Sequence, residues 1–151
     1  MDIEVDSPAG PDVTQLLSEH LADMYATSPP ESVHALDVNA LTAPGITFWT
    51  ARRDGELLGC GALKELDPDH GELKSMRTTA AAGGTGVGKA LVVHLIAEGR
   101  SRGYSRLSLE TGPQEYFAPA RGLYASQGFT SCGRFADYAE DPYSVYFTLL
   151  L

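Results

Sequence analysis

Four glycines fall within six residues where a strand-like pattern gives way to a helical one. They lie in the segment Gly83-Gly84-Thr85-Gly86-Val87-Gly88-Lys89. Glycine lets the backbone approach a ligand closely, and the first turn of a helix presents N–H groups that no helical carbonyl accepts. The segment is therefore predicted to bind a phosphate or diphosphate group. The competing interpretation is a glycine-rich turn with no ligand.

Two nucleotide motifs fit this segment poorly. Gly83 and Gly88-Lys89 match the G-x-x-x-x-G-K of a P-loop, but Ala90 replaces the Ser or Thr that would bind magnesium. The G-x-G-x-x-G of dinucleotide-binding folds has no register here, because Lys89 or Leu91 stands where the last glycine would be. A nucleotide phosphohydrolase stays as an alternative on the strength of the P-loop match.

The elements around the glycines predict a single α+β domain that spans residues 1–151. Helical periodicity follows Pro11, and after the glycines it runs from Val87 to about Arg102. Strands are predicted near Ile3 and at 46–51, 57–63, 72–79, 106–111, 129–132 and 145–150, with a short helix at 119–126. A meander followed by a strand–helix–strand crossover predicts a mixed, mostly antiparallel sheet with helices on both faces and one parallel crossover.

A second motif lies downstream of the glycine loop. Residues 120–129 read Ala-Arg-Gly-Leu-Tyr-Ala-Ser-Gln-Gly-Phe. Together with the strand 73–78 and the loop, they resemble the motifs of the GNAT N-acetyltransferase superfamily over about residues 72–150. Two positions depart from the pattern: Gly83, where Gln or Arg is usual, and Phe117, where Asn is frequent. The resemblance implies a GNAT-like acyl-CoA N-acyltransferase fold. It also implies direct acetyl transfer from acetyl-CoA to a primary amine in a ternary complex. No metal is expected, because the four histidines are scattered and the two cysteines have no metal-ligand spacing.

The resemblance also implies roles for individual residues. Backbone groups of Met76, Arg77 and Thr78 would bind the pantetheine arm, and an N–H near Met76 or Arg77 would polarise the thioester carbonyl. The diphosphate would bind to the loop formed by Gly83, Gly84, Thr85, Gly86, Val87, Gly88 and Lys89. Tyr124 matches the family tyrosine beside the thioester sulfur and is a candidate general acid. Its alternative is a packed aromatic residue with a satisfied hydroxyl.

Glu72 and Glu110 are the candidate general bases. A base is needed because a lysine-like ammonium, with a reference pKa of about 10.4, must lose a proton before it attacks. In an unbroken strand Glu72, Lys74 and Met76 share one face, and if the strand of Glu110 is a neighbour, both carboxylates border one cleft. Either carboxylate could instead be solvated or ion-paired, and the sequence leaves this open. Asp137, Tyr138 and Asp141 could receive a cationic acceptor.

Charge and composition limit the classes of molecule that the chain is expected to bind. The net charge is −9, which argues against nucleic acid. Residues 1–75 hold 14 acidic and 4 basic residues, whereas residues 76–151 hold 6 and 7, so a cationic small molecule or peptide is the expected acceptor. The chain has no apolar run long enough for a membrane span and no secretory signal, so a cytoplasmic location is predicted.

Two further questions stay open in the sequence. A non-catalytic acyl-CoA-binding or sensing module on the same fold is an alternative to the enzyme. The last predicted strand, 145–150, could offer an edge for a homodimer.

Overall fold

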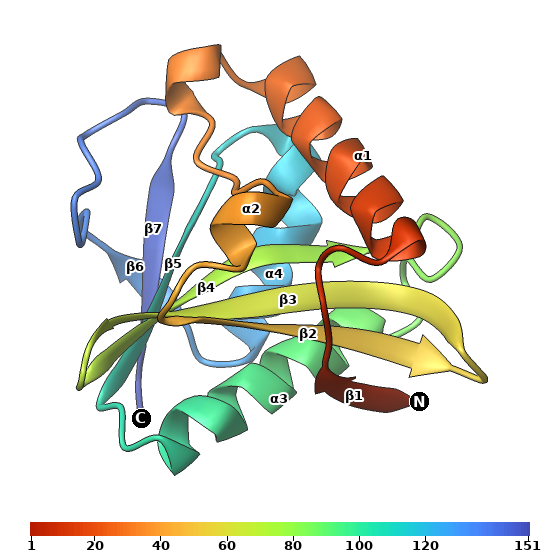
Figure 1. Cartoon of the computed structure of the whole chain (residues 1–151). Helices are drawn as coiled ribbons and strands as arrows, with labels where there is room; N and C mark the ends of the chain where they lie inside the picture. The colour runs from red at the N-terminus through yellow and green to blue at the C-terminus, as the bar shows by residue number, and fades with distance from the viewer.

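The computed structural model describes all residues, 1–151, as one mixed sheet with helices on both of its faces (Figure 1). The elements in chain order are β1 (Asp2–Val5), α1 (Pro11–Thr27), η1 (Pro30–Ser32), α2 (Val38–Leu41), β2 (Ile46–Arg53), β3 (Glu56–Asp67), β4 (His70–Thr78), α3 (Val87–Ser101), β5 (Arg106–Thr111), η2 (Glu115–Phe117), α4 (Ala118–Ser126), β6 (Thr130–Cys132) and β7 (Val145–Leu150). No helix combines the length and the apolar character that crossing a membrane requires.

The sheet has the order β1-β2-β3-β4-β5-β7-β6. All neighbours are antiparallel except β4 and β5, which α3 connects as a crossover. The predicted fold class is therefore confirmed. The expected free edge at β7 is wrong, because β7 is paired with β5 on one side and with β6 on the other.

Strand alternation supplies a separate core to each face of the sheet. Phe48 of β2 packs toward α1 and α2, in a cluster with Val13 and Leu17. Its neighbour Trp49 points the opposite way, into the cluster formed with α3, α4 and β5. In Figure 1, α1 and α2 lie over one face of the sheet and α3 lies under the other.

A β-bulge in β4 interrupts this alternation. The register passes from Ala62↔Lys74 to Cys60↔Arg77, so that two residues of β4, Ser75 and Met76, lie opposite Gly61. Ser75 has a φ of 55°, in the left-handed region. Met76 therefore packs on Gly61 on the α3 face, and the expectation that it shares a face with Glu72 and Lys74 is wrong.

The close contact between β3 and β4 near this bulge can be tested at Gly59. A Cβ at this position would lie 2.9 Å from the Arg77 carbonyl oxygen and 3.1 Å from a methyl group of Leu91 on α3. Because the backbone of β4 would have to shift, Gly59→Ala should destabilise the protein by about 1–3 kcal/mol. Thermal unfolding measures this change, at about 2–4 °C per kcal/mol for a chain of this size.

Gly133→Ala is the matched control, because nothing lies within 4 Å of its Cβ position and its φ is not positive. Its stability should stay within about 0.5 kcal/mol of the parent. Equal thermal unfolding midpoints for Gly59→Ala and Gly133→Ala would contradict the close packing at Gly59.

Candidate active site

The start of α3 forms an open cluster of backbone donors. Gly84 and Gly86 have φ values of 74° and 90°, and no side chain caps the helix. Five N–H groups donate to no acceptor in the chain, those of Gly84, Gly86, Val87, Gly88 and Lys89. The Thr85 hydroxyl donates to the Ala82 carbonyl and so helps to hold the loop. Converging N–H groups at a helix N-terminus are the arrangement that binds an anion.

A cavity of about 420 Å³ adjoins this cluster. One wall is the end of β4, namely Met76, Arg77 and Thr78. The opposite wall is α4, with Leu123 and Tyr124. Gly84, Gly86, Gly88 and Lys89 line it as well. Seven of the ten residues predicted to bind the cofactor thus line one space, which leads from the start of α3 to Tyr124. Gly83, Thr85 and Val87 do not line it, and the Val87 side chain is buried in the core.

The sheet opens beside this cavity. β4 and β5 pair only at His70↔Arg106, Gly71↔Leu107 and Glu72↔Ser108, and beyond these pairs the strands separate. A second cavity, of about 120 Å³, is lined by residues of α1, β4, β5 and the segment between β6 and β7. Met76, Ala120 and Tyr124 line both cavities, so the two spaces meet where the strands part.

Tyr124 lies at this junction with 7% of its surface exposed. Its ring packs edge-on against Phe129, with 5.8 Å between the ring centroids. Burial alone raises the pKa of its phenol, since no charged or hydrogen-bonding group of the protein acts on it. The hydroxyl is therefore protonated at neutral pH and free to donate to a ligand.

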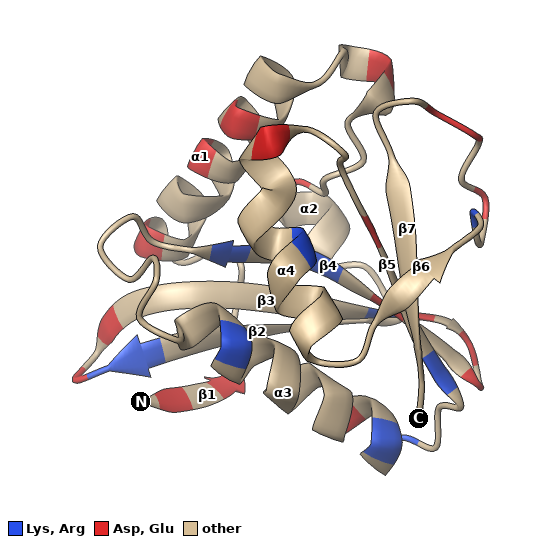
Figure 2. Ribbon diagram, turned by 180° about the vertical axis from the view of Figure 1, so that it is seen from behind, with Lys and Arg blue, Asp and Glu red and all other residues tan.

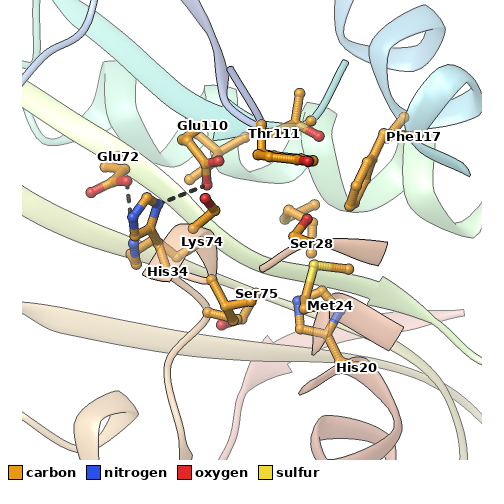
Figure 3. Close-up of a pocket in the computed structure, with 18 of the residues that line it drawn as sticks. His20, Met24, Ser28, His34, Glu72, Lys74, Ser75, Glu110, Thr111 and Phe117 are labelled. Carbon is orange, nitrogen blue, oxygen red and sulfur yellow. Dashed lines mark hydrogen bonds and ion pairs between the residues drawn. The ribbon is translucent and has the colours of Figure 1, made fainter. Parts of the chain in front are cut away.

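Glu110 lines the second cavity without a close cationic partner. Burial raises the pKa of its carboxyl to about 7. The nearest ring nitrogen is Nδ1 of His34, 3.8 Å from Oε1, as Figure 3 shows. A carboxyl that titrates near neutral pH inside a cavity can accept a proton from a bound amine.

Glu72 faces the same cavity in a different environment. It is 2% exposed, and its Oε2 accepts hydrogen bonds from the Tyr138 hydroxyl at 2.5 Å and from Lys74 Nζ at 3.3 Å. Lys74 Nζ also donates to the Tyr138 hydroxyl at 2.9 Å. The parallel pairing of β4 and β5 brings Glu72 and Glu110 to one cavity, as expected from the crossover. Lys74 and Tyr138 hydrogen-bond to Glu72, whereas the Ser144 hydroxyl and the charge of Lys74 offset the burial of Glu110 only in part.

The other predicted acceptor-binding residues have different surroundings. Tyr138 belongs to the Glu72 network, and Asp141 accepts a 2.6 Å hydrogen bond from Ser32. Asp137 is exposed. Acidic residues lie along α1 and along the segment between β6 and β7 (Figure 2). Both of these regions contribute residues to the wall of the second cavity.

Arg77 turns its side chain away from the first cavity toward α1. Its guanidinium donates to Asp23 at 2.7 Å and to the Tyr116 hydroxyl at 3.1 Å. The Tyr116 hydroxyl donates to Asp23 in turn, at 3.1 Å. This cluster joins β4, α1 and η2 across the opening in the sheet, and it leaves the Arg77 backbone as the part that can contact a ligand between the strands.

Sequence reasoning missed His34 as a site residue and did not foresee the contact between Tyr138 and Glu72. His34 and Tyr138 lie in irregular segments, and the Tyr138–Glu72 contact spans 66 residues of sequence. Neither hydrophobic period nor motif spacing marks such positions.

Comparison with known proteins gives the family. The sequence model of the Acetyltransferase (GNAT) family matches residues 13–129. The chain is 55% identical over 148 residues to the uncharacterized N-acetyltransferase YsnE of Bacillus subtilis strain 168, with 98% of each chain covered. It is 39% identical over 145 residues to the IAA acetyltransferase of Azospirillum brasilense, covering 93% of this chain and 92% of that one.

Solved structures share the whole fold. A Klebsiella pneumoniae protein provisionally assigned as an acyl-CoA N-acyltransferase superposes with a TM-score of 0.80 at 26% identity, covering 99% of this chain and 97% of that one. A GNAT family acetyltransferase from Elizabethkingia anophelis, whose crystal structure holds acetyl-CoA, has the same fold, with a TM-score of 0.69 at 19% identity and coverage of 99% and 97%. Because the family model matches residues 13–129 and relatives that are 55% and 39% identical cover nearly the whole chain, this chain belongs to the GNAT family of acetyltransferases.

Proposed function

We propose that this protein transfers the acetyl group of acetyl-CoA to a primary amine of a small molecule or peptide, directly, in a ternary complex. The proposal rests above all on one feature: the free N–H groups at the start of α3 and the Glu110 carboxyl line two cavities that meet at Tyr124. Acetyl-CoA bound in the first cavity and an amine bound in the second would then both lie beside the Tyr124 hydroxyl.

The first cavity suits coenzyme A. Its diphosphate would bind to the N–H groups of Gly84 to Lys89, where the helix dipole also favours negative charge. The pantetheine arm would lie between β4 and β5, whose facing edges have unpaired backbone groups beyond Glu72↔Ser108. Acetyl-CoA supplies the activated acetyl group, and an N–H near Met76 would polarise its carbonyl.

The second cavity suits a cationic acceptor. The Glu110 carboxyl would take the proton of a bound ammonium directly or through a water molecule, and the neutral amine would then attack the thioester. Tyr124 would give a proton to the departing thiolate. Glu72, which accepts hydrogen bonds from Lys74 and Tyr138, would position the acceptor. The acidic segments beside the cavity would draw in a positively charged amine.

Binding of the donor is tested by thermal unfolding with acetyl-CoA, with ATP as the comparison. Acetyl-CoA at 100 times its dissociation constant should add about 2.7 kcal/mol of stability, and ATP with magnesium should add much less. Gly88→Asp should raise the KM for acetyl-CoA by about ten-fold or more, because it places a carboxylate beside the diphosphate. An acidic residue in the first turn of a helix is favourable, and the methyl group of Leu123, 3.3 Å from the Cβ position of Gly88, would have to shift slightly to accept it.

Gly122→Asp is the control for added charge. Gly122 is exposed on α4 and has nothing within 4 Å of its Cβ position. Equal KM values for the two aspartate variants would contradict the diphosphate site. Tight binding of acetyl-CoA with no release of CoA across a broad panel of amines would favour a sensing module.

Tyr124→Phe should lower kcat by about 10²-fold while leaving the KM for acetyl-CoA nearly unchanged. The reason is that the phenol donates only to the leaving sulfur, and the ring that packs on Phe129 is retained. The melting temperature should not fall, because the hydroxyl has no partner in the protein. Steady-state kinetics and thermal unfolding measure both effects.

Tyr104→Phe provides the comparison, since its hydroxyl donates to Glu65 at 2.8 Å, away from both cavities. This variant should lose some stability and keep its kcat. A Tyr124→Phe enzyme with the parental kcat would rule out the general acid.

The pH profile tests Glu110. A base must be deprotonated to act, so kcat/KM should rise with pH through about 7, the pKa of the Glu110 carboxyl. Glu110→Gln should abolish this limb and lower kcat/KM at pH 8 by about 10²–10⁴-fold.

Glu115→Gln, at an exposed position on η2, should behave as the parent. A limb that persists in Glu110→Gln and disappears in Glu72→Gln would assign the base to Glu72 instead.

A further inference from the structure

Acetyl transfer to an ammonium releases one proton per turnover. The reaction is RNH₃⁺ + CH₃CO–S–CoA → RNH–COCH₃ + HS–CoA + H⁺, in which an N–C bond forms and a C–S bond breaks. The ammonium loses two protons, and the thiolate takes up only one of them. If the proposed function holds, the other proton must pass from Glu110 to solvent before the next acceptor can be deprotonated.

Glu110 is poorly placed to return that proton to water by itself. Its side chain is only 17% exposed where it lines the second cavity. Lys74 and Tyr138, its neighbours on that wall, are already hydrogen-bonded to Glu72. An additional group is therefore needed between Glu110 and the surface.

His34 occupies this position. It lies in the segment between η1 and α2, and its Nδ1, which is buried and has no hydrogen-bond partner, is 3.8 Å from Glu110 Oε1 (Figure 3). The side chain as a whole is 28% exposed, so the ring extends from the buried carboxyl to solvent. A gap of 3.8 Å is too long for a hydrogen bond, so a small side-chain rotation or one bridging water completes the contact.

The groups around His34 are suited to proton transfer toward solvent. Tyr138, on the segment between β6 and β7, packs edge-on against the imidazole at 5.0 Å. On the same segment Asp141 is half-exposed, and its pKa is lowered by hydrogen bonds from Ser32 and the Tyr143 N–H, with the charge of His34 adding to this effect. Glu72 and Lys74 of β4 line the same cavity but are bonded to each other. The imidazole thus lies beside the mostly buried Glu110 carboxyl and near the half-exposed Asp141 carboxyl.

We propose that His34 is a proton relay, which takes the proton from Glu110 at Nδ1 and passes it to solvent from Nε2. The other histidine of this cavity, His20, lies at the opposite end beside Met24 and makes no contact with Glu110 (Figure 3). The role acts through Glu110, so His34 would not touch the reacting atoms.

The test is chemical rescue. In dilute buffer without imidazole, His34→Ala should lower kcat by about ten-fold, and added imidazole should restore most of it by carrying the proton in place of the side chain. His34→Gln keeps a hydrogen-bonding side chain that cannot carry a proton, so it should be as slow as His34→Ala. His94→Ala, which removes an imidazole that packs on Trp49 outside both cavities, should keep the parental kcat with or without imidazole.

Parental kcat in His34→Ala, a loss that imidazole does not restore, or full activity in His34→Gln would each overturn the relay. These outcomes are separate from a failure of the proposed function. If the parent protein releases no CoA from acetyl-CoA with any of the amines tested, the proposed function is wrong, and the relay is wrong with it.

Discussion

The separation of β4 from β5 is the feature on which the rest of this site depends. The two strands share three residue pairs and then part. Buried backbone N–H and C=O groups are nearly always hydrogen-bonded, so two facing strand edges without partners call for water or a ligand between them. The amide-containing pantetheine arm of coenzyme A can supply such bonds along its length. The opening also joins the two cavities, since Tyr124 is reached from both.

The bulge at Ser75 gives one strand two roles. A non-glycine residue at positive φ costs of order 1–3 kcal/mol, and it persists where the surroundings hold it. Here the long pairing with β3 and the contact of the Cys60 thiol with the Ser75 carbonyl do so. Before the bulge β4 sends Glu72 and Lys74 to the acceptor side. After it, Met76 points to the α3 face, so in the proposed function the same strand would contact both substrates.

Local patterns in the sequence predicted most of the fold and the positions of several candidate site residues. The bounds of β5 and β7 agree with their apolar alternation, and the glycine-rich loop lies at the start of α3 as expected. The convergence of Glu72 and Glu110 followed from the crossover. The bulge could not be predicted, because Ser75 carries no signal for a positive φ, and Met76 was therefore assigned to the wrong face. The contacts of His34 and Tyr138 depend on two irregular segments that are far apart in the sequence. A hydrogen bond between Ser32 and Asp141, 109 residues apart, joins the same two regions.

Glu72 and Glu110 differ in the groups that interact with their carboxylates. Glu72 is the more deeply buried, yet a lysine and a phenol compensate its charge, and such a pair is stabilising only if it is fully hydrogen-bonded. At Glu110 the effect of burial outweighs that of the Ser144 hydroxyl and of the Lys74 charge, so its pKa in the folded state lies above its value in the unfolded chain. The folded protein then binds this proton more tightly than the unfolded chain does, and its stability falls as pH rises from about 4.5 toward 7. A lysine or arginine at hydrogen-bonding distance would remove that cost, but it would also lower the pKa and make the carboxylate a weaker base. An uncompensated carboxyl that destabilises the fold at the pH where it can accept a proton is the arrangement expected of a catalytic group.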